Sequence, residues 1–193
     1  TVTSGASFTA TSPGPSNSTT PAAVNLSNSA NDFRGPVAIE QASAVTLVDS
    51  VGGIQLANVN DTGSLSVTST GGSITQAANS AINAGGTTTL AATANGTPAD
   101  ITLSGTGNNF VGPVNVSAGD DVTLVDGTGG LTLGTVTTTG NLAPSALGGD
   151  LVMGTSSIGG SLTTTSTGTT DLGRATITGT GDVTATSGGA LNL

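Results

Sequence analysis

Five aspartates have side chains whose type and spacing could bind a metal ion. Each directly precedes an aliphatic residue suited to a strand: Asp100, Asp121, Asp150, Asp171 and Asp182. The separation of the first two in sequence number (121 − 100) equals that of the next two (171 − 150). If the chain winds into turns of about that length, the carboxylates would stack and could share Ca²⁺, which prefers oxygen ligands. The candidate calcium ligands are Asp100, Asp121, Asp150 and Asp171.

A plainer interpretation is that each aspartate caps a turn by accepting hydrogen bonds from nearby backbone N–H groups. The nonapeptide of calcium-binding β-rolls, which begins Gly-Gly-x-Gly-x-Asp, is not reproduced, although Gly179-Thr180-Gly181-Asp182 is a fragment of it. We therefore expect no metal site and no cofactor, with Ca²⁺ binding kept as the alternative.

The residues that catalysis needs are scarce. The chain has no His and no Cys, which excludes Ser-His and Cys-His pairs and any metal site containing His. Glu40 is the only glutamate, and Arg34 and Arg174 are the only cations. The carboxylate clusters and basic subsites of polysaccharide-cleaving enzymes are therefore missing. We expect no catalytic residue and no enzymatic activity.

The composition indicates a folded chain that avoids nucleic acids and membranes. Of the 193 residues, 34% are hydrophobic and only 7% are charged, and the net charge is −9. Such a surface repels nucleic acid and anionic lipid. No apolar run approaches the length of a membrane-spanning helix, and residues 1–4 lack the features of a signal peptide. We expect an excised or mature piece of a longer chain.

Short strands with alternating side chains recur throughout the sequence. Typical pieces are Val45-Thr46-Leu47 and Leu131-Thr132-Leu133, in which the aliphatic residues would face inward and Thr outward. Pairs such as Gly52-Gly53 and Gly129-Gly130 end these pieces and suit corners that need positive φ. Thr, Gly and Val all disfavour helices. The pattern therefore predicts an all-β fold.

Two periods organise these strands. Phe33 and Phe110 are related by an offset of 77 (110 − 33), and the segments around them match at the same offset: Asn-Asp/Asn-Phe-x-Gly-Pro-Val and Val-Thr-Leu-Val-Asp. A shorter period, 65 − 45, separates Val45 from Leu65. Repeats of this length predict a parallel β-helix, or β-solenoid, with about 20 residues per coil. We expect four coils in each 77-residue unit and roughly nine or ten in the chain.

The repeat divides one solenoid segment, residues 1–193, into four parts. Residues 1–22 form an irregular start with a Pro-rich loop, 23–99 the first copy, 100–176 the second, and 177–193 a degenerate partial coil. The three prolines between positions 11 and 21 cannot donate to a ladder, so a loop should protrude there. Phe33 and Phe110 should each fill the core at a corner, and exposed aromatic anchors are the alternative.

The repeated motifs resemble those of a known family. The two segments above, followed by Leu-x-Val-Thr-x-x-Gly-Gly-x-Ile-Thr-Gln from Leu65 to Gln76, are similar to repeats of filamentous-haemagglutinin-type adhesins. The resemblance covers about residues 23–176. It implies a right-handed parallel β-helix, export across the outer membrane and a stalk or adhesive rod. The Asn-Pro-Asn-type motifs of the family's secretion domain are missing, which implies interior shaft.

These observations together predict a structural role. We expect a shaft segment of a bacterial cell-surface or secreted adhesin or filament that contacts neighbouring repeats or copies of itself end to end. It could also meet a host or environmental surface ligand, without nucleic acid or membrane insertion. Two alternatives stay open: a Ca²⁺-stiffened rod, and a binding module whose Thr-rich face meets ice or a glycan. Regular Thr columns in the structure would favour ice.

Overall fold

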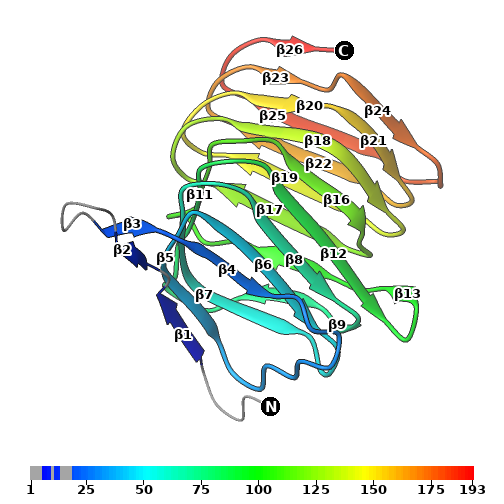
Figure 1. Cartoon of the computed structure of the whole chain (residues 1–193). Helices are drawn as coiled ribbons and strands as arrows, with labels where there is room; N and C mark the ends of the chain where they lie inside the picture. The colour runs from blue at the N-terminus through cyan, green and yellow to red at the C-terminus, as the bar shows by residue number, and fades with distance from the viewer. Residues whose placement is uncertain (1–5, 10, 14–18) are drawn as a thin grey trace.

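The fold consists of strands wound into a solenoid. The computed structural model describes the backbone of residues 6–9, 11–13 and 19–193, and the side chains of residues 21–193. No helix occurs in these ranges, and hence none that could span a membrane. The chain makes about 8 turns of about 20 residues each, with β1 at one end and β26 at the other (Figure 1). The predicted all-β parallel solenoid is confirmed.

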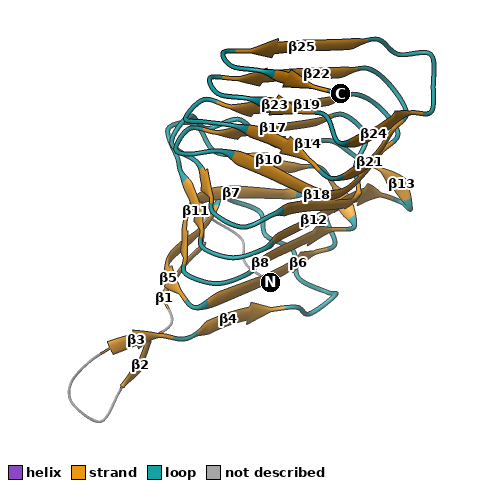
Figure 2. Ribbon diagram, turned by 90° about the horizontal axis from the view of Figure 1, so that it is seen from above, coloured by secondary structure: helices purple, strands orange, loops and turns teal. Residues whose placement is uncertain are grey.

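Two large sheets form the opposite sides of the solenoid (Figure 2). Sheet I has eleven strands: β1 (Ala6–Thr9), β5 (Val37–Ala42), β7 (Ile54–Asp61), β10 (Ile74–Gln76), β11 (Ile82–Ala84), β14 (Ile101–Leu103), β15 (Asn109–Phe110), β17 (Val122–Asp126), β19 (Leu142–Ala146), β22 (Leu162–Ser166) and β25 (Val183–Ser187). Its strands pair in parallel, because each turn brings the chain back in the same direction.

Sheet II has thirteen strands: β4 (Ala23–Leu26), β6 (Ala44–Asp49), β8 (Leu65–Ser69), β9 (Gly71–Gly72), β12 (Thr88–Ala94), β13 (Thr97–Pro98), β16 (Val114–Ala118), β18 (Leu131–Thr138), β20 (Leu151–Met153), β21 (Thr155–Ile158), β23 (Thr170–Asp171), β24 (Arg174–Ile177) and β26 (Leu191–Asn192). Within sheet II, β9 and β13 are the strands that pair antiparallel in the described residues, both with β12.

The number of turns is smaller than the sequence predicted, because two turns are longer than the others. In the first, Ala6 pairs with Val37 in sheet I, an offset of 37 − 6. In the second, Ile74 pairs with Ile101 in sheet I, an offset of 101 − 74, and Thr88 pairs with Val114 in sheet II, an offset of 114 − 88. All these offsets exceed the shorter period read from the sequence. The short antiparallel pair β12–β13 protrudes within the second of these turns (Figure 1). A uniform winding at the shorter period therefore overestimates the number of coils.

The 77-residue unit also does not contain four coils. Val45 lies in sheet II, paired with Val24 and Leu65, whereas its repeat partner Val122 lies in sheet I, paired with Ile101 and Leu142. Between them the chain changes sheet seven times, which is three and a half turns. Successive units are therefore related by a half-turn, and equivalent residues face opposite sides of the solenoid.

The two copies keep the same local structure despite this change of sides. Strand β7 and its counterpart β18 both have eight residues and the same alternation of buried and exposed side chains. Inward positions form columns of aliphatic side chains such as Ile54, Ile74 and Ile101, each at most 1% exposed. Burying one such side chain contributes about 1.5–3 kcal/mol. The aliphatic columns thus make one continuous core.

The corner after β6 depends on glycine. Gly52 and Gly53 have φ values of +81° and +86°, and Gly129, which is equivalent to Gly52, has +94°. A Cβ on Gly53 would also lie 2.5 Å from the backbone oxygen of Ser73 in the next turn. Only glycine satisfies both conditions at position 53.

A second hairpin lies beside the first turns. Strands β2 (Thr11–Pro13) and β3 (Thr19–Pro21) pair antiparallel and project from the solenoid (Figures 1 and 2). The predicted Pro-rich loop falls on this stretch, and residues 14–18 lie outside the described part. Strand β1 pairs with β5 through a register shift of the same kind that β12 makes with β16. β1, in the irregular start, is therefore the counterpart of β12.

Candidate functional site

The repeated Asn-x-Phe motif forms the corner that joins one turn to the next. Asn31 donates from Nδ2 to the carbonyl oxygens of Leu26 (2.8 Å) and Val48 (3.2 Å). Leu26 lies in its own turn and Val48 lies in the next. The same side chain therefore holds two successive turns together.

Asn108 repeats this arrangement in the second copy. Its Nδ2 donates to the carbonyl oxygens of Leu103 (3.4 Å) and Val125 (3.2 Å), one before it and one after it in the chain. Asn31 bonds at the same two sequence separations. The contact is thus a property of the motif.

An aspartate completes each corner. The backbone N–H of Phe33 donates to Asp49 Oδ1 (2.9 Å), and that of Phe110 donates to Asp126 Oδ2 (2.8 Å). Thr128 N–H also donates to Asp126 Oδ1 (2.9 Å). Both Phe side chains are buried, 6% and 1% exposed. The prediction that they fill the core at a corner is confirmed. We call each set of Asn, Phe and Asp a corner clamp.

Gln76 adds a link to the second corner clamp. Its Nε2 donates to Asn108 Oδ1 (2.7 Å), and Asn108 Nδ2 donates back to Gln76 Oε1 (3.0 Å). Ile82 N–H also donates to Asn108 Oδ1 (2.9 Å), and Gly105 N–H donates to Gln76 Oε1 (2.8 Å). The glutamine of the Ile-Thr-Gln ending therefore connects the first 77-residue unit to the second.

Burial dominates the electrostatics of three aspartates. It raises the pKa of Asp49, Asp61 and Asp126 above the ordinary value, while hydrogen bonds from backbone N–H groups act in the opposite direction. For Asp49 the charge of nearby Asp32 also raises the pKa. Asp49 Oδ2 and Asp61 Oδ2 are buried without a hydrogen-bond partner in the described residues. These carboxyl groups favour the neutral form more than exposed ones do.

Two of the four candidate calcium ligands lie in adjacent turns. Asp121 N–H donates to Asp100 Oδ1 (3.2 Å), and Asn141 N–H donates to Asp121 Oδ1 (2.7 Å). The series continues with Ser161 N–H to Asn141 Oδ1 (2.8 Å) and Asp182 N–H to Ser161 Oγ (3.1 Å). Each side chain thus accepts from the backbone one turn further on. We call this series the polar ladder.

Asp150 and Asp171 do not take part in the polar ladder. Asp171 pairs in register with Val152 rather than with Asp150, because Leu151 pairs with Thr170 and this turn is shorter than the spacing of the two aspartates. Asp150 Oδ1 accepts from Thr169 N–H (2.7 Å), and Asp171 Oδ1 from Gly173 N–H (2.9 Å). Within the described part of the chain, no three His, Cys, Asp or Glu side chains converge on a possible ion position.

A column of threonines lies beside the polar ladder, on the outside of sheet I. Thr75 pairs with Thr102, Thr102 with Thr123, and Thr163 with Thr184. Ala143, paired with Thr123, interrupts the column, and Gln55 begins it. The threonines are half-buried or exposed. Within the described residues, this threonine column is regular from Thr75 to Thr184 except at Ala143.

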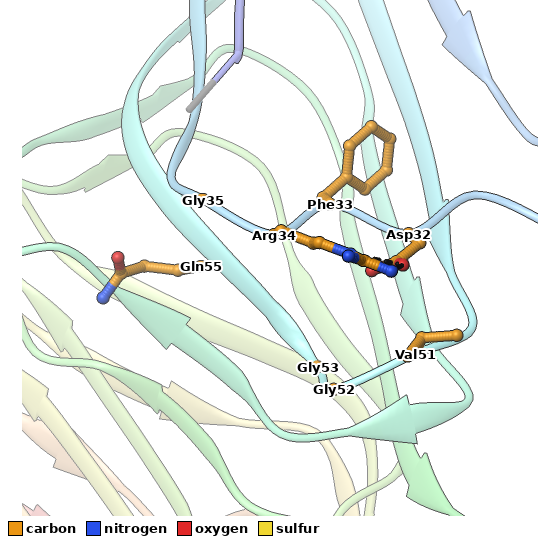
Figure 3. A pocket seen from close by; sticks show the side chains of 8 residues that line it. All are labelled: Asp32, Phe33, Arg34, Gly35, Val51, Gly52, Gly53 and Gln55. Carbon is orange, nitrogen blue, oxygen red and sulfur yellow. Dashed lines mark hydrogen bonds and ion pairs between the residues drawn. The ribbon is translucent and has the colours of Figure 1, made fainter. Parts of the chain in front are cut away.

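A cleft of about 380 Å³ opens at the corner of the first copy (Figure 3). Arg34 Nε and Nη2 each lie 2.7 Å from Asp32 Oδ2. Gly52, Gly53 and Gln55 also line the cleft, and the Gln55 amide points away from the ion pair. We call it the first-copy cleft.

The sequence assigned a role to the phenylalanines of the corner clamps but none to their asparagines and aspartates. Asn31, Asn108, Asp49 and Asp126 all belong to the segments that recur at the 77-residue offset. The sequence offered one signal for their role: these residues are the same in both copies, whereas surface positions of the repeat differ. What could not be read from the sequence is which carbonyl oxygens and N–H groups they bind.

The fold and the corner clamps define a β-solenoid repeat protein. A family model described as repeats of unknown function (DUF5649) matches residues 42–117. That match covers almost the length of one repeat unit. Comparisons with curated proteins and with solved structures gave no match.

Proposed function

We propose that this chain is a structural shaft segment of a bacterial cell-surface or secreted adhesin or filament, without catalytic activity. The observation that carries the proposal is the use of the repeated polar residues. Asn31, Asn108, Asp49 and Asp126 bond to neighbouring turns inside the solenoid. A motif repeated for catalysis or binding would instead present these side chains to solvent.

The stacking of turns supports the same role. Backbone hydrogen bonds run from turn to turn in both sheets, so that each turn is held by its neighbours and stability adds up along the axis. Near the C-terminal end, Leu162, Leu172, Ile177 and Val183 line an apolar cleft of about 410 Å³. This surface supports the predicted end-to-end contact with neighbouring repeats or copies of the chain.

Lengthening the solenoid by one unit tests the proposal. A second copy of residues 42–118 is inserted after residue 118, which keeps every repeat position in phase. At about 4.8 Å per turn, three and a half turns add about 17 Å to the rod. Small-angle X-ray scattering should show that increase in the largest dimension, and the melting temperature should not fall.

The control carries the same inserted residues in shuffled order. Length and composition are then unchanged, but the inward columns and the corner clamps are lost. An in-phase insert that leaves the largest dimension unchanged, or that melts like the shuffled insert, contradicts a shaft built by stacking units.

The threonine column favours a second candidate, a face that orders water at an ice surface. Hydroxyl groups recur there at the spacing of successive turns, about 4.8 Å. If this face acts on ice, the protein should inhibit ice recrystallisation, and Thr102→Lys with Thr123→Lys should abolish the effect. Thr46→Lys, on sheet II, is the control. Crystal growth that is the same with and without protein excludes this function.

A further inference from the structure

We propose that Asn95, at the tip of the β12–β13 hairpin, is a site of spontaneous covalent modification, where the side-chain amide is converted to aspartate and isoaspartate. This inference goes beyond the shaft role and does not depend on it. Asn95-Gly96 is the single Asn-Gly pair in the sequence. The hairpin that carries it projects from the solenoid (Figure 1).

The geometry of the turn explains why these two residues stand at the tip. Ala94 pairs with Thr97, so the loop between them has two residues. The φ values are +51° at Asn95 and +81° at Gly96. Two-residue hairpin loops of this type I′ kind need positive φ at both positions, and Asn followed by Gly meets that need best. The fold therefore selects a dipeptide whose second residue has no side chain to shield its backbone nitrogen.

The reaction needs only the two tip residues and water. The Gly96 backbone nitrogen attacks Asn95 Cγ, so that a bond from this nitrogen to Cγ forms and the bond from Cγ to Nδ2 breaks. Nδ2 takes up the proton that the Gly96 nitrogen gives up and leaves as ammonia, and a cyclic succinimide remains. Water then opens the ring at either carbonyl carbon, which yields aspartate or isoaspartate.

The surroundings of the tip leave this attack unhindered. Asn95 and Gly96 are both exposed. Apart from the adjoining residues, no heavy atom lies within 4 Å of the place that a Cβ on Gly96 would take. Among the described residues, no hydrogen bond holds the Asn95 side chain or the Gly96 N–H. Both reacting groups are therefore free to approach each other.

Asn79 provides an internal comparison at a different corner. Among the described residues it is the other non-glycine residue with positive φ, +58°, and it is also exposed. The nitrogen that would attack it belongs to Ser80, which carries a side chain and donates to the Ala77 carbonyl oxygen (3.3 Å). Exposure and positive φ alone therefore do not make a reactive asparagine, and we expect Asn79 to stay unmodified.

Asp126-Gly127 provides a second comparison, because aspartate before glycine can close the same ring with loss of water. Asp126 is fully buried. Its carboxyl oxygens accept from Phe110 N–H (2.8 Å) and Thr128 N–H (2.9 Å). Gly127 N–H, the attacking group, donates to the Asn108 carbonyl oxygen (2.9 Å). The corner clamp thus holds both reacting groups apart, and this pair should not react in the folded protein.

Modification should change the hairpin and leave the solenoid intact. Isoaspartate places the former side-chain Cβ in the backbone, and the longer loop no longer fits the pairing of Ala94 with Thr97. The first residues of β12, Thr88 to Leu90, pair with β8 and β16 outside the hairpin. Each event also places a negative charge on residues 93–98, which carry none in the sequence.

Ageing of the folded protein tests the proposal. The intact chain is incubated at mildly alkaline pH in water enriched in oxygen-18. Isoaspartate is measured by enzymatic methylation and located by mass spectrometry of thermolysin peptides. We expect oxygen-18 and isoaspartate to appear at Asn95, with Asn79 and Asp126 unchanged and the chain eluting as a more acidic species on ion exchange. Asn95→Gln, which keeps an amide on a longer side chain, should stay unconverted over the same time.

The chain unfolded in guanidinium chloride is the reference for each site. Conversion of Asn95 in the unfolded chain but not in the folded one overturns the proposal, because the turn would then protect the pair. Conversion of Asn79 or Asp126 as fast as Asn95 in the folded protein also overturns it, since hydrogen bonding would then not select the site. Aspartate without isoaspartate would mean direct hydrolysis and overturn the ring route. The length of the rod tests the shaft role separately.

Discussion

At the scale of single residues, the corner clamps rest on two asparagines with unequal numbers of partners. The Asn108 side chain bonds to Gln76, Ile82, Leu103 and Val125. The Asn31 side chain bonds to the carbonyl oxygens of Leu26 and Val48. Removing one partner from a buried polar group costs about 1–3 kcal/mol for each group left without a hydrogen bond. The two sites should therefore differ in sensitivity.

We expect Asn108→Ala to lower the free energy of unfolding by about 3–4 kcal/mol, because several buried groups lose their partner. Asn31→Ala should cost about half as much and serves as the matched comparison. Urea denaturation followed by circular dichroism measures both values. Equal losses would show that the link to Gln76 adds nothing to stability.

The buried aspartates predict an unusual dependence of stability on pH. Because burial raises the pKa of Asp61 in the folded state, the native protein keeps this proton at pH values where the unfolded chain has released it. Its contribution to stability is therefore fully present below the unfolded value, near 3.8, and is lost as pH rises through the raised folded value. Asp49 and Asp126 act in the same direction.

Asp61→Asn isolates this effect because asparagine does not titrate. Relative to the wild type, the variant should lose stability at pH 3.5 and lose less, or gain, at pH 7. Denaturation in urea at the two pH values measures the difference. The same change in both conditions would mean that Asp61 titrates alike in the folded and unfolded states.

At the scale of elements, the sequence predicts where the strands lie, but it predicts only some of the strand pairs. Alternation at Val45-Thr46-Leu47 identifies β6, and the partner of Val45 in β8, Leu65, could be read from the shorter period. The partner of Thr88 could not, because the hairpin β12–β13 lengthens that turn and Thr88 pairs with Val114. Tertiary pairing, which no local pattern encodes, decides the register there.

The candidate functional site, like the strand pairing, was predicted only in part from the sequence. The spacing of Asp100 and Asp121 correctly placed them in adjacent turns. The equal spacing of Asp150 and Asp171 did not bring those two together, since the turn between them is shorter and pairs Asp171 with Val152. Burial of Asp49 and Asp126 was hidden because an aspartate at a strand end is usually exposed. Only the folded corner shows their inward orientation.

The corner after β6 gives a prediction for two neighbouring glycines. Gly52→Ala should cost about 1 kcal/mol, because φ is positive but no atom lies within 4 Å of the new Cβ. Gly53→Ala should cost clearly more, because its Cβ would also lie 2.5 Å from Ser73 O. Thermal melting of both variants measures the difference. Similar costs would mean that the next turn does not approach as closely as described.

At the scale of the whole molecule, the polar ladder predicts how the thermal stability of the solenoid responds to Ca²⁺. Asp100 and Asp121 accept backbone hydrogen bonds in adjacent turns, so we expect them to stabilise the stack without an ion. Thermal melting by far-ultraviolet circular dichroism, with millimolar Ca²⁺ and with EDTA, should then give the same midpoint. A rise of many degrees with Ca²⁺ would indicate binding to the native state and favour the Ca²⁺-stiffened rod.

Each 77-residue unit winds through three and a half turns, and one cross-linking measurement tests this winding most directly. Thr89 pairs with Asn115 in sheet II, whereas a uniform winding at the shorter period would place it beside Asn109. The chain has no cysteine of its own. Neighbouring parallel strands are about 4.8 Å apart, close enough for a disulfide. Oxidation should cross-link Thr89→Cys with Asn115→Cys and leave Thr89→Cys with Asn109→Cys open. The opposite result would contradict the half-turn relation between the repeats.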